Sequence, residues 1–164
     1  MSDPTDAASD PAASIPRAPV LALPDQHGAE QSLSAILADH PALLVFYPFA
    51  FSSICGNELT ELQHHLQPVL TRQNIQLLAI SCDPIYALRT YADREEFTFP
   101  LLSDFWPHGE AARAYGVFDE AKGCATRGSF LVAQDGTIRW SLLNPISQAR
   151  PLSAYHDAIA LLGA

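Results

Sequence analysis

The longest apolar runs of the chain predict buried strands. Residues 41–48, PALLVFYP, and residues 75–81, IQLLAIS, are almost continuously apolar, which is typical of strands covered on both faces of a central sheet. Residues 20–28, VLALPDQHG, predict a short strand followed by a turn at His27-Gly28. Residues 99–104, FPLLSD, predict a further short extended segment.

Helical spacing follows each of the two long runs. A helix is predicted from about Ser53 to Thr71, because leucines three or four residues apart form one apolar face. These are Leu59, Leu62, Leu66 and Leu70. Residues 83–97 predict a second helix, since Asp83-Pro84 reads as a cap followed by proline at the first helical position.

The second half of the chain predicts a hairpin between two helical segments. Residues 108–117 predict one or two helical turns, and residues 151–163 predict a final amphipathic helix. Between them, residues 127–143 alternate around Asp135-Gly136, a strong hairpin signal. The resulting order, β-α-β-α-(α)-β-β-α, predicts an α/β domain with a thioredoxin-like fold, in which helices flank a central mixed sheet.

Length and charge narrow the function classes. We expect one folded domain, residues 18–164, after a disordered acidic tail, residues 1–17. Nine basic against eighteen acidic residues give a net charge of -9, which argues against nucleic acid or an anionic membrane as a partner. No signal peptide or membrane-spanning run is evident, and three cysteines do not make a disulfide framework. A cytoplasmic protein is therefore expected.

Cys55 directly follows the first long apolar run, within FYPFAFSSICGNEL, residues 46–59. The reactive form of cysteine is the thiolate, and a helix N-terminus, a nearby cation or hydrogen bonds lower the pKa of a free thiol from about 8.5. If Ser52 or Ser53 caps the helix, Cys55 lies in its first turn, where backbone N–H groups are free. The preceding loop follows the C-terminal end of a strand, where active sites of open α/β sheets gather. The sequence therefore predicts a reactive Cys55.

Pro48, Ser52 and Cys55 have the spacing of the peroxiredoxin active-site motif, Pro-x-x-x-Thr/Ser-x-x-Cys. Further blocks resemble the AhpE-like subfamily in order along the chain, at residues 55–59, 97–123 and 127–140. The chain thus resembles peroxiredoxins of the AhpC/TSA superfamily, and within them the one-cysteine AhpE-like subfamily, over nearly all of its folded part. This resemblance implies peroxiredoxin-type N-terminal and central additions to the thioredoxin-like fold.

The resemblance also implies a role for each matching residue. Cys55 would be the peroxidatic cysteine, which attacks the peroxide O–O bond and becomes a sulfenic acid. Ser52, where the family usually has threonine, would hydrogen-bond the thiolate or the peroxide, and Pro48 would shield the thiolate from water. Arg127 matches the arginine that stabilises the thiolate and polarises the peroxide oxygens. Glu58 matches the glutamate that orients this arginine.

Two further cysteines are candidates for a resolving cysteine. Cys82 follows the second long strand at the sheet edge of the Cys55 loop, and Cys124 precedes Arg127 by three residues. Both also fit buried packing residues, with Cys82 slightly ahead as a candidate. The position five residues after Cys55, where some relatives carry a resolving cysteine, is Thr60. A one-cysteine mechanism, recycled by an external thiol, is the leading interpretation.

The partners implied by the resemblance are a peroxide and a reductant. The peroxide would be hydrogen peroxide, an organic hydroperoxide or peroxynitrite, and the reductant a low-molecular-weight thiol or a thioredoxin- or mycoredoxin-like protein. A homodimer or higher homo-oligomer is also implied. Aromatic residues expected as apolar lining or contact surface are Phe49, Phe51, Phe105 and Trp106. No cofactor or metal is expected, because the adjacent His64 and His65 point in different directions on a helix and no Cys-x-x-Cys pair is present.

A hypothesis from another class stays open at this point. The chain could be a non-enzymatic thioredoxin-fold redox sensor or holdase, whose Cys55 oxidises without efficient turnover. A thiol–disulfide oxidoreductase is disfavoured, because Glu58 stands where its second cysteine would be. The presence of Arg127 favours the peroxidase, since a sensor has less need of an arginine that polarises peroxide.

Overall fold

A five-stranded mixed sheet forms the centre of the structure, a computed structural model that describes residues 16–162. In spatial order its strands are β5 (Leu101–Ser103), β4 (Gln76–Ser81), β3 (Ala42–Phe46), β8 (Arg127–Val132) and β9 (Ile138–Asn144). The pairs β3/β4 and β4/β5 are parallel, whereas β8 runs antiparallel to both β3 and β9. Two-stranded ribbons are formed by β1 (Ala22–Pro24) with β2 (Glu30–Ser32), and by β6 (Phe118–Asp119) with β7 (Cys124–Ala125).

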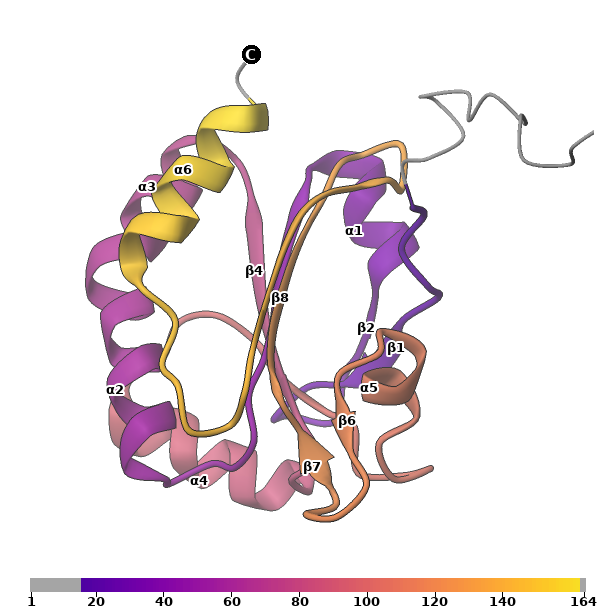
Figure 1. The fold of residues 1–164 in the computed structure, drawn as a ribbon, viewed down its shortest axis with the longest axis vertical. Helices are drawn as coiled ribbons and strands as arrows, with labels where there is room; N and C mark the ends of the chain where they lie inside the picture. Colours follow the sequence, from indigo (N-terminus) through magenta and orange to yellow (C-terminus); the bar gives the residue numbers. More distant parts are fainter. Residues whose placement is uncertain (1–15, 163–164) are drawn as a thin grey trace, which may run out of the picture.

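Helices cover both faces of this sheet (Figure 1). One face carries α2 (Ser53–Glu61), the π-helical segment η1 (Leu62–Leu66), α3 (Gln67–Arg72), α4 (Ile85–Glu95) and α6 (Leu152–Leu162). The other face carries α1 (Leu33–Asp39) and α5 (Glu110–Ala114), together with the two ribbons. Every residue of β3 is buried, because its side chains enter an apolar core on each face. The predicted α/β architecture with a central mixed sheet is confirmed.

The leucine spacing predicts one continuous helix after Cys55, but the structure has an interruption within it. It widens into the π-helical segment η1, where the N–H of Gln67 donates to the carbonyl of Leu62, five residues earlier. Pro68 explains the change, because it has no N–H for the carbonyl of His64 and its ring would clash with that carbonyl in an α-helix. The predicted apolar face survives, since all four of its leucines are buried.

Asp83 does not cap the helix that follows it, so this prediction is wrong. The N-cap of α4 is Pro84, and no side chain caps the helix. The carboxylate of Asp83 turns toward the loop before α2, where its Oδ2 accepts from the N–H of Ala50 (2.9 Å) and from the hydroxyl of Ser81 (2.7 Å). Asp83 therefore fastens the loop that leads to Cys55 onto the end of β4.

The two predicted turns are confirmed. β8 and β9 pair through a turn in which the N–H of Gly136 donates to the carbonyl of Ala133. Gly136 has φ +87°, a conformation that favours glycine. β1 is followed by the turn at His27-Gly28, where the N–H of Gly28 donates to Asp25.

Residues 1–15 of the predicted tail lie outside the described residues, whereas its last residue, Arg17, forms a β-bridge with Thr137. Within residues 16–162, every helix is too short or too polar to cross a lipid bilayer.

Candidate active site

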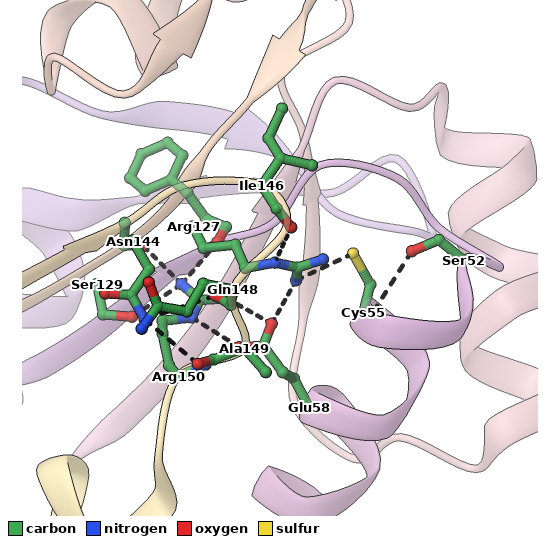
Figure 2. A network of polar contacts seen from close by, with 12 residues as sticks. Ser52, Cys55, Glu58, Arg127, Ser129, Asn144, Ile146, Gln148, Ala149 and Arg150 are labelled. Carbon is green, nitrogen blue, oxygen red and sulfur yellow. Dashed lines mark hydrogen bonds and ion pairs between the residues drawn. The ribbon is translucent and has the colours of Figure 1, made fainter.

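Four of the predicted site residues meet at one edge of the sheet (Figure 2). Ser52, Cys55 and Glu58 come from the start of α2, which follows the C-terminal end of β3. Arg127 is the first residue of β8. Because β8 runs antiparallel to β3, its first residue lies at the edge where β3 ends. Residues 72 positions apart are thereby brought into contact.

Ser52 is the N-cap of α2, which places Cys55 in the first turn as predicted. Ser52 has an extended backbone (ψ 148°), and its Oγ accepts from the N–H of Cys55 at 3.4 Å. The Cys55 side chain is fully buried. The partial positive charge of a helix N-terminus favours a negative charge on this sulfur.

Arg127 connects the sulfur to a buried carboxylate. Its Nη1 lies 3.3 Å from the Sγ of Cys55 and 2.5 Å from the Oε1 of Glu58. Its Nε donates to the carbonyl of Ile146 at 2.7 Å. Ile146 and Glu58 thus hold the guanidinium at its Nε and Nη1, and the same Nη1 also faces the thiol, as Figure 2 shows.

Glu58 is held by two arginines and stays ionised. Its Oε2 accepts from the backbone N–H (2.6 Å) and the Nε (3.1 Å) of Arg150, and its Oε1 accepts from the Nη2 of Arg150 at 3.1 Å as well as from Arg127. Burial opposes ionisation, but the hydrogen bonds and charge of Arg150, together with the charge of Arg127, hold the pKa of Glu58 below its ordinary value. An ionised Glu58 can orient Arg127 and is poorly suited to accept a proton.

Arg150 is a residue of this network that the sequence did not reveal. It is buried, and its Nη1 donates to the carbonyls of Phe46 (2.8 Å) and Gly128 (3.0 Å) and to the hydroxyl of Ser129 (2.9 Å). It therefore ties the ends of β3 and β8 to Glu58. The one signal in the sequence is its place directly before Pro151 at the start of the final helix, and this says nothing about where the side chain points.

The loop between β3 and α2 carries backbone strain close to the thiol. Phe51 has φ +66°, which is unusual for a bulky residue. Its ring packs against Tyr91 of α4, with centroids 4.9 Å apart. The Tyr91 hydroxyl is buried and makes no hydrogen bond to any residue in the described range. Burial, and then the negative charge of a Cys55 thiolate, raise the pKa of Tyr91. Sequence reasoning did not single out Tyr91.

A cavity of about 560 Å³ opens beside Ser52 and Arg127. Three loops contribute most of its lining: the loop before α2, the turn between β6 and β7, and the loop between β9 and α6. The lining includes Pro48 and Phe49 from the first loop, Lys122 from the second, and Pro145, Ile146 and Ser147 from the third. Ser53 and Ile54 at the start of α2 and Asp119 at the end of β6 also line it. Since Ser52 and Arg127 both line the cavity and contact Cys55, a small molecule in it lies next to the residues around the sulfur.

The other two cysteines are buried and are not bonded to Cys55. All three cysteines are free thiols. Burial, with the nearby Asp104 carboxylate, raises the pKa of Cys82 to about 12. Burial, with the nearby Asp119 carboxylate, raises the pKa of Cys124 to about 11. Both thiols are therefore protonated at neutral pH. Among residues 16–162, no group of three or more His, Cys, Asp or Glu side chains is placed to hold a metal ion.

Known proteins are similar to this chain in sequence. The family model of the AhpC/TSA family matches residues 16–141. Alkyl hydroperoxide reductase E of Mycobacterium tuberculosis is 42% identical over 147 residues, covering 90% of this chain and 95% of that protein. Peroxiredoxin 1 of Brugia malayi is 31% identical over 116 residues, covering 66% of this chain and 49% of that protein.

Solved structures agree with these relatives. Peroxidoxin BcpB from Mycobacterium tuberculosis superposes with a TM-score of 0.78 at 26% identity, covering 91% of this chain and 95% of that chain. AhpC of Enterococcus faecalis superposes with a TM-score of 0.81 at 27% identity, covering 91% of both chains. The predicted thioredoxin-like fold with peroxiredoxin-type additions is thereby confirmed. The chain belongs to the AhpC/TSA family and is a peroxiredoxin, a thiol-dependent peroxidase.

Proposed function

We propose that Cys55 carries out the peroxidase reaction as the peroxidatic cysteine of a one-cysteine mechanism. The thiolate of Cys55 attacks the terminal oxygen of a hydroperoxide, so that an S–O bond forms while the O–O bond breaks. The leaving alkoxide takes up a proton and departs as an alcohol, or as water when the substrate is hydrogen peroxide. Cys55 is then a sulfenic acid, oxidised by two electrons.

The single observation that carries this proposal is the contact between Arg127 and Cys55. A guanidinium 3.3 Å from the sulfur stabilises negative charge on it and can donate to the oxygens whose charge develops as the O–O bond breaks. Because Glu58 and the Ile146 carbonyl already fix the guanidinium, little reorganisation is needed during the reaction. A cysteine that served only to pack would have no use for a buried, ion-paired arginine at its sulfur.

Ser52 and Pro48 complete the proposed site. The hydroxyl of Ser52 is close enough to the start of α2 to accept from the Cys55 N–H, and it can turn its own proton toward the thiolate or a bound peroxide. Pro48 lines the cavity and has no N–H that would compete for the peroxide oxygens.

An external thiol would recycle the sulfenic acid. The reductant thiolate attacks the sulfur of the sulfenic acid, which releases water and leaves a mixed disulfide; a second thiol then releases Cys55 and a disulfide of the reductant. Cys82 and Cys124 are poor resolving residues in this scheme, because their raised pKa values leave almost no thiolate at neutral pH. A low-molecular-weight thiol or a thioredoxin- or mycoredoxin-like protein is the proposed reductant.

A second copy of the chain is the proposed structural partner. Four large apolar side chains are exposed: Phe49 and Phe51 in the loop before α2, and Phe105 and Trp106 in the segment between β5 and α5. An apolar surface of this kind is typical of a protein interface. We expect a homodimer, or a higher homo-oligomer, that covers these aromatics. The free thiols favour a reducing, cytoplasmic setting.

Steady-state turnover tests the proposal. Consumption of an alkyl hydroperoxide is followed with excess low-molecular-weight thiol, for the wild type and for Cys55→Ser. We expect many turnovers per wild-type chain and none above background for Cys55→Ser. A wild type that consumes one equivalent of peroxide and stops, with every thiol or thioredoxin-like reductant offered, would instead identify a redox sensor.

A further inference from the structure

The single lysine of the chain lies on the rim of the Cys55 cavity. Lys122 is one of nine basic residues, and the other eight are arginines. It belongs to the turn between β6 and β7, whose tip lies at the end of the sheet where α2 begins (Figure 1). Its side chain is exposed and lines the cavity beside Arg127, in a protein whose net charge is -9. A cation placed there raises the local concentration of anions at the entrance of the cavity, whereas the net negative charge of the protein repels anions.

The charge of Lys122 is not consumed by the neighbouring acids. Within residues 16–162, its ammonium forms no ion pair, whereas the adjacent Glu120 pairs with Arg113. Asp119 lines the same cavity, but its Oδ1 accepts from the backbone N–H groups of Ala121 (2.9 Å) and Lys122 (3.0 Å). Its carboxylate thus serves to hold the turn, and its charge partly opposes that of the lysine.

Arg127, the other cation that lines the cavity, is already bound to residues of the proposed reaction centre. Its Nη1 contacts Glu58 and Cys55, and its Nε is bonded to Ile146. A substrate that presents its peroxide group to Arg127 therefore has Lys122 as the cation for any second, anionic group.

The rest of the cavity fits a carbon skeleton. Its volume of about 560 Å³ falls in the range of small-molecule sites and far exceeds the space of two peroxide oxygens. Apolar side chains that line it are Pro48, Phe49, Ile54, Pro145 and Ile146. The cavity thus combines a reactive end, apolar walls and a cation at the rim.

We infer that Lys122 makes the enzyme prefer organic hydroperoxides that carry a carboxylate over neutral hydroperoxides of the same size. The peroxide group meets Cys55 and Arg127, the carbon chain contacts the apolar lining, and the carboxylate pairs with Lys122. The inference rests on the proposed role of Cys55. Because the ion pair is exposed, the preference is about two- to fivefold at low ionic strength and declines as salt is added.

The test compares hydroperoxyhexanoate with its methyl ester, which differ in charge and hardly in size. Stopped-flow rate constants for the oxidation of Cys55 are measured with both, and with hydrogen peroxide as the reference in each protein. For the wild type we expect an acid-to-ester ratio of about two to five. The ratio falls to about one in Lys122→Gln and below one in Lys122→Glu, and it rises in Asp119→Asn.

Arg139→Gln is the matched control, because it also removes one exposed positive charge. Arg139 lies on β9, pairs with Asp135 in the preceding turn and does not line the cavity, so its loss leaves the ratio at the wild-type value. A fast wild-type reaction with a ratio of one, or a ratio that Lys122→Glu does not change, overturns the inference alone. A wild type that hydrogen peroxide oxidises no faster than free cysteine overturns the proposed function and this inference with it.

Discussion

The Nη1 of Arg127 lies 3.3 Å from the sulfur of Cys55, although 72 positions separate the two residues. The antiparallel pairing of β8 with β3 brings their backbones to one edge of the sheet. Glu58 and the Ile146 carbonyl then fix the guanidinium so that it faces the sulfur. The reactivity that we assign to Cys55 therefore depends on a contact between two separate parts of the fold.

Arg127→Gln should slow the oxidation of Cys55 by about 10²- to 10³-fold, the usual effect of losing one donor that stabilises developing charge. Arg127→Lys should recover only part of the rate, because an ammonium cannot contact Cys55, Glu58 and Ile146 together. Stopped-flow oxidation by hydrogen peroxide measures both. Arg139→Gln, a charge removal on an exposed strand, serves as the control. A rate within threefold of wild type for Arg127→Gln would contradict the assigned role.

Glu58→Gln should destabilise the fold at neutral pH by about 3–5 kcal/mol, because it leaves two buried arginines without their carboxylate. The pKa of Glu58 is depressed in the folded state, so its contribution is complete above the unfolded value of about 4.3 and is lost as the pH falls through the lower folded value. The difference between the two proteins should thus be constant from about pH 5.5 to 7 and shrink below about pH 4. Urea unfolding at each pH measures it.

Glu61→Gln provides the matched control for this pH series. Glu61 lies on the same helix and is exposed, so its substitution should change the free energy of unfolding by less than about 0.5 kcal/mol. A Glu58→Gln variant that is equally stable, or whose deficit persists unchanged to pH 3, would show that Glu58 is not the ionised centre of the network.

The local parts of this site could be predicted from the sequence, and the distant parts could not. Ser52 as a cap and Cys55 in the first turn follow from short-range spacing, which determines a helix start by itself. Arg150 gave no such signal, because its partners Glu58 and Phe46 are 92 and 104 positions away. Asp-Pro is typical of a helix cap, and so the sequence predicts one at Asp83. Its carboxylate instead bonds Ala50 across 33 positions, a contact that exists only once β3 and β4 are paired.

Ser52→Ala should lower the rate of Cys55 oxidation by about two- to tenfold, the range for one hydrogen bond. The cap contact with the Cys55 N–H is long, at 3.4 Å, so the loss of stability should lie near the low end of the range for caps, about 0.5 kcal/mol. Ser52→Thr should keep or raise the rate, since the added methyl restricts χ1. Rates from stopped flow and midpoints from thermal unfolding check both variants. Equal rates in all three proteins would exclude the hydroxyl from the reaction.

The mass of the protein after one equivalent of peroxide should increase by one oxygen atom. Burial raises the pKa of Cys82 to about 12 and that of Cys124 to about 11, so both thiols are protonated at pH 7 and neither can attack the sulfenic acid efficiently. Intact-mass spectrometry with rapid acid quenching measures this, and a trapping reagent for sulfenic acids should label Cys55. Cys82→Ser and Cys124→Ser should give the same result as wild type. A loss of two hydrogens that either substitution abolishes would identify that residue as a resolving cysteine.

The rate of Cys55 oxidation by hydrogen peroxide tests the central claim most directly. Reduced wild type and Cys55→Ser are mixed with peroxide in a stopped-flow instrument at neutral pH, with free cysteine measured under the same conditions. We predict a second-order rate constant at least about 100-fold above that of free cysteine, as expected from the stabilisation that Arg127 supplies, and no such phase in Cys55→Ser. A wild-type rate equal to that of free cysteine, or a fast phase that persists without Cys55, would contradict the account.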